Sequence, residues 1–380
     1  MLRSRVLSTI NEIDEETWDS IVGKDQLISS YMYLKAVEES GINVCFCRYP
    51  LVYEEDKLVA HTCIYKMYFE PDIFARGKLK RFINLVRRIW PNFLKLALLE
   101  CGTPVALGNT ISYAPQADRK KVLKIIVDTM EKTAKENRIG IILLRDFSNQ
   151  DLDFYDTLKS HKFRRLENLP NTMIENKWSG FKEYLDSMRG HYRYKIRKRI
   201  EKFEEGELTV EITASFSDIA SELLRLWQSV FEHAREYTRE ILSEDFFRNM
   251  DSYMGDKTKV VLLKKKDKIL GFALILMGSE TMKFTFMGLD YEYNERYCVY
   301  FNTFYNVVKL GIESGRKRFD MGITTYIPKM DIGARIVPLY IYMKHRNRFL
   351  SFLLTGAVRL MTPVRDFGTR RVFKERIEAG

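Results

Sequence analysis

A stretch near the C-terminal end of the chain decides the fold. Residues 281–322 read TMKFTFMGLDYEYNERYCVYFNTFYNVVKLGIESGRKRFDMG, and residues 323–346 continue as ITTYIPKMDIGARIVPLYIYMKHR. The segment 283–289 is rich in aromatic and β-branched residues, which is typical of a buried strand. Apolar positions then recur at helical spacing, at Phe304, Val307, Val308, Gly311 and Ile312. Gly315 is expected to end this helix, and an extended pattern follows, so the stretch predicts a strand, a crossover helix and a neighbouring strand.

Polar residues gather directly after the second predicted strand. They are Asp320, Thr324, Thr325, Tyr326, Lys329 and Arg335. Open α/β sheets usually bind ligands beyond the carboxyl ends of their strands. We therefore expect a binding or catalytic site at this end of the sheet.

Length and composition indicate two domains. The chain has 380 residues, of which 46% are hydrophobic. This length exceeds one comfortable core, and the apolar content suffices for two. We expect an N-terminal unit at residues 1–175, a C-terminal unit at 176–348 and a basic amphipathic tail at 349–380.

The two halves repeat one pattern. Residues 51–65 form a predicted hairpin with a charged turn, and residues 260–276 repeat it. A predicted helix followed by the apolar strand IGIILLRDF, residues 139–147, matches the helix and strand predicted within 304–321. The predicted fold class is therefore α/β, with mixed α+β sheets in two tandem units and additional amphipathic helices.

The charge predicts an anionic partner. The formal net charge is +11 and the pI is near 9.2, which suits nucleic acid, a membrane surface or a phosphate-bearing cofactor without distinguishing them. A basic run that includes Arg193 and Arg197 lies on a long helix predicted to begin after Ser179. This run is either a solvated face or a phosphate-contacting one.

Two further segments combine basic residues with large apolar ones, at 77–102 and 345–376. Their apolar runs are shorter than the roughly 20 residues that a membrane-spanning helix needs. Each is either an amphipathic helix packed on its own domain or a helix in the membrane interface. The second alternative predicts an anionic membrane surface as a partner.

Cysteine and histidine usage indicates the compartment. Five cysteines without CxxC spacing, and a first segment without a long apolar core, predict a reduced cytoplasmic protein without a secretory signal. The amphipathic segments add a peripheral position on the inner membrane face. The five histidines show no metal-binding spacing, so no metal is expected.

The segment YFNTFYNVVKLGIESGRKRFDMGITTYIPKMDIGA, residues 300–334, resembles a known pattern, as does the basic helix GHYRYKIRKRIEKF at 190–203. Both resemble the tandem form of the GNAT superfamily, which includes the Fem aminoacyltransferases and related predicted N-acyltransferases. The resemblance spans roughly residues 29–345. It implies two tandem GNAT-like units that transfer an acyl group from a thioester or an aminoacyl ester to an amine.

One departure from that pattern concerns the donor. Acetyl-CoA-binding members carry a Gly-rich turn ahead of the crossover helix, and its N–H groups hold the pyrophosphate. The corresponding stretch here, LDYEYNERYCVYFN, has Arg296 but no glycine. This departure argues against ordinary acetyl-CoA binding and leaves room for a larger donor, either long-chain acyl-CoA as co-substrate or an aminoacyl-tRNA.

Acyl transfer to an amine needs a base and a donor group beside the developing oxyanion. His233, in a polar helical context, is a candidate base or a solvated histidine. The resemblance implies that Lys329 stabilises the tetrahedral intermediate or a donor phosphate, although an ordinary loop lysine is the alternative. Tyr326 is a candidate proton donor for a leaving thiolate or a packed aromatic.

The remaining candidate residues are expected to bind substrate or donor. They are Asn302, Asp320, Thr324, Thr325, Arg335, Arg193 and Arg197. The chain has no GxSxG motif, and Cys101 has no histidine close in sequence, so a covalent acyl-cysteine route is the weaker alternative.

Three hypotheses remain. The first is an N-acyltransferase that moves a long acyl chain from acyl-CoA to an amine acceptor, such as a sphingoid base or aminolipid, at the membrane surface. The second is a Fem-like transferase that takes an amino acid from tRNA, with the basic helix on the RNA backbone. The third is a non-enzymatic module that binds anionic surfaces. The polar cluster after a strand end favours the two enzymes.

Overall fold

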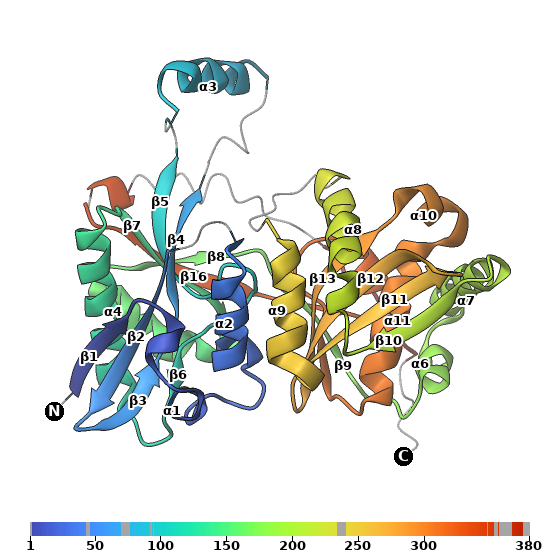
Figure 1. The fold of residues 1–380 in the computed structure, drawn as a ribbon, viewed down its shortest axis with the longest axis horizontal. Coiled ribbons are helices and arrows are strands. Elements are labelled where there is room, and N and C mark those ends of the chain that lie inside the picture. Colours follow the sequence, from blue (N-terminus) through green and yellow to red (C-terminus); the bar gives the residue numbers. More distant parts are fainter. Residues whose placement is uncertain are drawn as a thin grey trace.

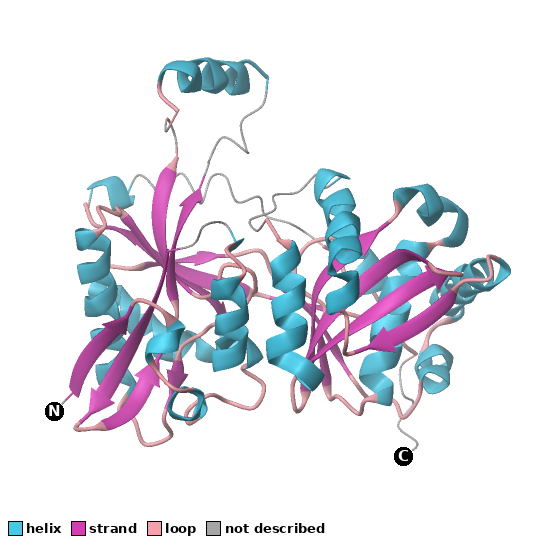
Figure 2. Cartoon of the chain, viewed as in Figure 1, coloured by secondary structure: helices cyan, strands magenta, loops and turns pink. Residues whose placement is uncertain are grey.

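The computed structural model shows two mixed α/β halves side by side, each built on its own sheet (Figure 1). It describes residues 2–42, 46–69, 77–91, 93, 95–233, 241–347, 349–352, 356 and 367–374. Figure 2 shows helices flanking both sheets. The predicted α/β class with tandem units is confirmed.

The first sheet runs in the order β6-β3-β2-β4-β5-β7-β16-β8, and β1 pairs with β2. Its strands are β1 (Leu2–Leu7), β2 (Phe46–Glu54), β3 (Lys57–His61), β4 (Ile64–Phe69), β5 (Leu96–Cys101), β6 (Ser112–Tyr113), β7 (Ile141–Ser148), β8 (Arg164–Glu167) and β16 (Leu339–His345). Strands β5 and β7 are parallel, and the crossover between them contains α4 (Arg119–Glu136). The buried face of α4 packs on this sheet through Val122, Ile126 and Met130.

The second sheet runs in the order β10-β11-β12-β13-β14-β9-β15. Its strands are β9 (Asn171–Glu175), β10 (Thr209–Thr213), β11 (Thr258–Lys265), β12 (Lys268–Met277), β13 (Thr281–Leu289), β14 (Arg318–Asp320) and β15 (Arg335–Val337). Strands β13 and β14 are parallel, and α11 (Val299–Glu313) lies in the crossover between them. Phe304, Val307 and Val308 form the buried stripe of α11.

The halves share a strand pattern. Strands β2, β4 and β5 are antiparallel neighbours and β7 is parallel to β5, just as β11, β12 and β13 are antiparallel and β14 is parallel to β13. The last strand of each unit pairs in the other sheet, because β9 lies between β14 and β15, and β16 lies between β7 and β8. The expected boundaries at residues 175 and 348 therefore do not follow sheet membership. Apolar alternation marks a strand but does not say which sheet receives it.

The remaining helices are α1 (Glu15–Asp19), α2 (Tyr31–Glu39), α3 (Gly77–Ile89), α5 (Leu152–Tyr155), α6 (Phe181–Ser187), α7 (Gly190–Glu205), α8 (Ala220–His233), α9 (Glu244–Met254), α10 (Tyr291–Tyr297) and α12 (Tyr326–Asp331). Helices α2 and α9 join the halves, because residues of both lie in one buried cluster with α8. Helices α7 and α11 pack on the opposite face of the second sheet.

Helix α3 stands apart from both sheets, beyond the ends of β4 and β5 (Figure 1). Phe82, Leu85 and Ile89 on this helix are exposed, as is Trp90 after it. Among the described residues, no helix combines the length and the apolar character needed to cross a bilayer.

Candidate functional site

The two parallel strands of the second sheet separate soon after they meet. Their pairing covers three residue pairs, from Thr281 with Arg318 to Lys283 with Asp320. Strand β13 then continues to Leu289, whereas β14 ends at Asp320. The strands therefore diverge beyond Lys283, in the kind of place where α/β sheets bind ligands.

A part-buried ion pair closes the paired end of this opening. The Lys283 Nζ lies 2.5 Å from Asp320 Oδ2, and it also donates to the Leu107 carbonyl of the first half at 3.0 Å. Asn171 donates to Asp320 Oδ1 at 2.9 Å. Burial raises the pKa of Asp320, but the Lys283 charge and these hydrogen bonds outweigh it and hold the pKa below its ordinary value. Asp320 is therefore an ionised structural anchor.

The chain after β14 makes a strained turn, residues 322–325. Gly322, Thr324 and Thr325 have φ angles of 73°, 64° and 47°. Left-handed geometry is a clear outlier for a β-branched residue and costs about 1–3 kcal/mol at each such position. Such strain persists only where the surroundings determine the backbone, and it concentrates at binding and catalytic sites.

Two side chains hold this turn. Thr172 on β9 donates to the Gly322 carbonyl from its hydroxyl, at 2.5 Å, and from its backbone N–H, at 3.2 Å. The Lys329 ammonium, on α12, donates to the carbonyls of Gly322 at 3.2 Å and Ile323 at 2.7 Å. Lys329 is only 4% exposed. A buried cation therefore lies directly beneath the strained turn, and its charge is directed at the turn backbone.

A β-bulge lies beside the turn. Leu274 pairs with Phe286 and Ile275 with Phe284, so Thr285 is an extra residue that the ladder with β12 omits. The Thr285 hydroxyl donates to the Leu274 carbonyl at 2.8 Å. A Cβ built on Gly322 would lie 3.6 Å from the Phe284 carbonyl oxygen, so the turn and the bulge are neighbours. We call Lys283, the 284–286 bulge, Asp320, the 322–325 turn and Lys329 the turn site.

Tyr326 and Arg335 border this site. Tyr326 is buried, its hydroxyl donates to the Pro170 carbonyl at 3.0 Å, and its ring lies 4.4 Å from that of Phe367. Arg335 is exposed at the start of β15, opposite Met173. The structure therefore brings Asp320, Thr324, Thr325, Tyr326 and Lys329 together, as the sequence predicted, and leaves Arg335 at the rim.

His233 lies elsewhere. It is the exposed last residue of α8, its Nδ1–H donates to the Ser229 carbonyl at 2.7 Å, and its ring stacks on Tyr291 at 4.1 Å. Tyr291 follows the end of β13 at Leu289. Leu289 is five residues beyond Phe284, a distance of roughly 17 Å along the strand. The expected common site of His233 and Lys329 is therefore not formed, because β13 carries their neighbours apart.

Three further candidates lie on the α7 and α11 side of the sheet. Asn302 is buried, and its amide donates to the carbonyls of Arg199 and Cys298, so it ties α11 to α7. Arg193 donates to backbone carbonyls at the end of α6, and Arg197 lies 3.4 Å from Asp186. The long predicted helix is divided into α6 and α7 at Met188, which is extended and bridges to Phe373.

A side chain caps one N–H group at the N-terminus of each crossover helix. Helix α10 directly precedes α11, and its Asn294 side chain accepts from the Tyr300 N–H at 2.9 Å. At α4, the N-cap Asp118 accepts from Lys121 and places a carboxylate there. A pyrophosphate bound at a helix N-terminus needs those N–H groups and no competing negative charge. The geometry therefore agrees with the missing Gly-rich turn.

Cys101 does not have the character of a nucleophile. Burial raises the pKa of its thiol to about 11, although hydrogen bonds with Thr62 and Thr110 oppose the shift. Thr62 Oγ1 lies 3.2 Å from the sulfur. The reactive form of cysteine is the thiolate, which this environment disfavours.

The first half has a related cluster that the sequence analysis missed. Asp146 follows the β5–β7 pairing, has a φ of 65°, and accepts from Arg145 at 2.7 Å, Gly108 at 2.9 Å and Asn168 at 2.9 Å. Gly108 adjoins Leu107, which contacts Lys283, so one loop connects the two strand-end clusters. Lys283 and Asp146 shared a sequence signal, a charged residue within or at the end of an apolar strand.

Comparisons with solved structures show the same fold. FemX matches with a TM-score of 0.57 at 13% identity, over 92% of this chain and 99% of that one. The C-terminal domain of an Agrobacterium fabrum protein with the provisional name lysylphosphatidylglycerol synthetase matches with a TM-score of 0.55 at 12% identity, over 95% of this chain and 100% of that one. A tandem GNAT protein from the clavulanic acid biosynthesis pathway gives 0.52 at 8%, over 91% and 99%. These matches confirm the tandem GNAT-like fold.

A sequence relative is a Mycobacterium tuberculosis protein with the provisional name 8-amino-7-oxononanoate synthase 2. It is 24% identical over 321 residues, which are 83% of this chain and 42% of that protein. The chain therefore spans about two-fifths of its relative's length. The FemAB-like family, described as acting in peptidoglycan biosynthesis or recognition, matches residues 9–326. Because that match covers most of its length, the chain belongs to the FemAB-like family.

Proposed function

We propose that the chain is an amide-forming acyl or aminoacyl transferase and that the turn site is where the acyl group is transferred. The observation that carries this proposal is the strained 322–325 turn, held by the buried ammonium of Lys329 beside the bulge at Thr285. Membership of the FemAB-like family and the tandem GNAT-like fold support the same class of reaction.

The proposed reaction is an attack by a neutral amine on an activated carbonyl. The C–N bond forms and the carbonyl oxygen takes negative charge. The carbonyl then re-forms as the C–O or C–S bond breaks and the carrier leaves with the electron pair. The attacking nitrogen gives one proton to solvent, and the leaving carrier gains one. The bulge leaves Thr285 outside the ladder, so its backbone N–H is proposed to bind the oxyanion. The Lys329 charge beneath the turn adds a favourable potential.

Other residues have supporting roles in this proposal. Asp320 anchors Lys283 and stays ionised. Thr324, Thr325 and Arg335 are proposed to contact the donor at the rim. Tyr326 is proposed to protonate the leaving group. Its hydroxyl, which donates to the Pro170 carbonyl, would then have to donate to the departing atom instead. His233 stays a candidate only for contact with a distant part of the donor.

We favour an aminoacyl-tRNA as the donor. Asn294 of α10 already caps the Tyr300 N–H at the N-terminus of α11, which disfavours a pyrophosphate of a CoA donor at that position. The exposed basic residues of α7, among them Arg197 and Lys198, suit an RNA backbone. Peptidoglycan precursors and lipids are then the acceptor classes, because the family description names the first and a solved relative the second.

Long-chain acyl-CoA with an amine that becomes part of a lipid is the second candidate. The observation that favours it is α3, whose exposed Phe82, Leu85 and Ile89 suit contact with lipid. This donor would bind its phosphates at a site other than the start of α11. A tRNA donor predicts transfer that RNase abolishes and that salt weakens steeply, whereas an acyl-CoA donor predicts transfer that RNase does not affect.

The purified chain should therefore be tested with radiolabelled aminoacyl-tRNA and with radiolabelled acyl-CoA, in the presence of extracted lipid and peptidoglycan precursors. Label transfer from tRNA that stops on RNase treatment and falls steeply with salt supports the first donor. Transfer from acyl-CoA that ignores RNase assigns the second. No transfer from either donor, with binding to anionic surfaces retained, would contradict the transferase proposal and favour a non-enzymatic module.

A further inference from the structure

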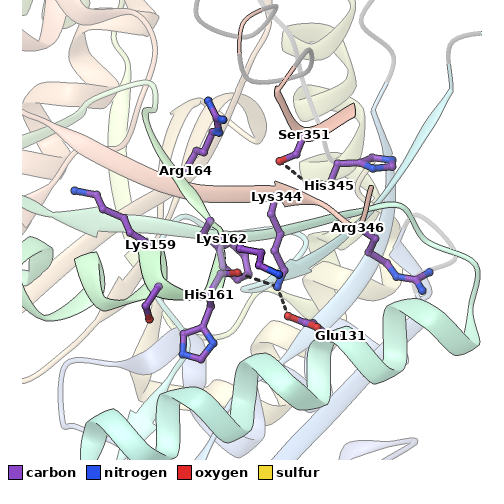
Figure 3. Close-up of a pocket in the computed structure, with 11 residues that line it drawn as sticks. Glu131, Lys159, His161, Lys162, Arg164, Lys344, His345, Arg346 and Ser351 are labelled. Carbon is purple, nitrogen blue, oxygen red and sulfur yellow. Dashed lines mark hydrogen bonds and ion pairs between the residues drawn. The ribbon is translucent and has the colours of Figure 1, made fainter. Parts of the chain in front are cut away.

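A basic pocket lies in the first half, away from the turn site. It encloses about 740 Å³ and is lined by the segments 159–164 and 344–346, with Glu131 of α4 and Ser351. Figure 3 shows the side chains from these elements arranged around it. The transfer chemistry proposed for the turn site uses none of these residues.

The pocket has a large excess of positive charge. Its cationic side chains are Lys159, Lys162, Arg164, Lys344 and Arg346, and Glu131 is the carboxylate among its lining residues. Lys344 pairs with Glu131, and Lys159 pairs with Asp156 at 2.6 Å. Among the described residues, Lys162 and Arg346 have no ion-pair partner. Uncompensated charges in a concave site favour an anionic ligand.

An apolar rim adjoins this charge. Ser351 lines the pocket and accepts from the His345 N–H at 3.2 Å. The residues around it expose large rings, with Phe349 70% and Phe352 61% exposed. Arg164 lies over the Phe352 ring at 5.3 Å. A cationic pocket beside exposed aromatic rings is suited to a ligand with an anionic head and an apolar body.

Strand register shows that α3 and the basic pocket lie at the same end of the strands of the first sheet. Ile141 of β7 pairs with Leu98 of β5 on one side and with His345 of β16 on the other. The end of β16, where the pocket lies, is therefore at the same end of the strands as the start of β5. Helix α3 projects beyond that end (Figure 1). Two exposed apolar segments and the pocket thus face one side of the molecule.

We infer that the basic pocket binds the phosphate headgroup of an anionic lipid while Phe349, Phe352 and α3 enter the membrane interface. Charge complementarity selects an anionic phosphate, and the exposed rings at the rim select a lipid over a soluble ion. Basic residues near an anionic membrane strengthen binding about fivefold each. This inference does not depend on which acyl donor the turn site uses.

The test is sedimentation of the full chain with vesicles of phosphatidylcholine alone, or of equal parts phosphatidylcholine and phosphatidylglycerol. The double variant Lys162→Ala/Arg346→Ala should bind the mixed vesicles about 25-fold more weakly. The matched control is Lys120→Ala/Lys124→Ala, which removes two exposed lysines from α4. Lys120 is eleven residues from Glu131, about 16 Å along the helix. The control should bind like the unchanged chain, and both variants should keep their melting temperatures.

Several results would overturn the inference. Equal sedimentation with both vesicle types excludes headgroup recognition, and an equal loss in the control excludes this pocket. Calorimetric binding of inorganic phosphate without vesicle binding would assign the pocket to a soluble ion. Binding of tRNA that the double variant weakens, again without vesicle binding, would assign it to RNA.

Discussion

Lys283 and Asp320 form the last cross-strand pair of β13 and β14, with 2.5 Å between the ammonium nitrogen and the carboxylate oxygen. The same ammonium reaches the Leu107 carbonyl in the first half. One part-buried pair therefore fixes the end of the strand opening and connects the halves. Removal of the Lys283 ammonium would leave the Asp320 carboxylate buried without its cation, which is costly.

We predict that Lys283→Met lowers the free energy of unfolding by about 3 kcal/mol. The matched control is Lys317→Met, because Lys317 also lies 2.5 Å from a carboxylate, that of Glu280, but in an exposed pair. The control should lose less than about 1 kcal/mol. Denaturant unfolding measures both, and equal losses would show that the Lys283–Asp320 pair has no special role.

Helix α3 provides a second prediction. Ile89 is 89% exposed and Trp90 is 60% exposed, so Ile89→Asp and Trp90→Asp should leave the melting temperature unchanged. Each should weaken binding to mixed vesicles about tenfold or more, because a large apolar side chain gains about 1.5–3 kcal/mol on leaving water. Ile212→Asp, on the edge strand β10, is the control and should bind normally. Unchanged binding in both α3 variants would remove α3 from the membrane contact.

His61 predicts a pH dependence of stability. Burial lowers the pKa of His61 to about 3, although its bond with the Trp18 carbonyl opposes the shift. The unfolded chain takes up a proton near pH 6.5 and the folded chain does not, so stability is lost as pH falls from about 6.5 towards 3. This residue contributes up to about 1.4 kcal/mol per pH unit. His61→Gln should show a shallower slope of unfolding free energy against pH, and an unchanged slope would contradict the assignment.

Much of the second half was predictable from sequence. The strand, helix and strand around α11 follow from apolar spacing, and the polar cluster after Asp320 follows from its place at a strand end. Local patterns of this kind show which face of a helix or strand is buried, and that depends on residues close together in the sequence.

The rest depends on contacts that sequence spacing does not contain. Thr172 holds the Gly322 carbonyl from a strand about 150 residues earlier, and β9 and β16 pair in each other's sheets. His233 was grouped with Lys329 because both are chemically suitable, but the length of β13 separates them. The sequence analysis named Asp320 as a candidate but not its partner Lys283, although a lysine within an apolar strand is a recognisable signal.

His233 therefore tests the extent of the site. His233→Ala should change the turnover rate less than about threefold, because its ring contacts Tyr291, beyond the end of β13, and the Ser229 carbonyl, and neither belongs to the turn site. The pH profile of transfer should also keep its shape. A loss that is largest near neutral pH and recovers at higher pH would instead restore His233 as the base.

The rate of single-turnover acyl transfer by Lys329 variants tests the central claim most directly. Lys329→Ala removes the buried cation that holds the carbonyls of Gly322 and Ile323, and we predict a rate about 10²–10³-fold lower. Lys329→Arg should recover part of that rate, because a cation remains, and His233→Ala serves as the matched control. A near-normal rate in folded Lys329→Ala, by circular dichroism and melting temperature, would contradict the assignment of the turn site.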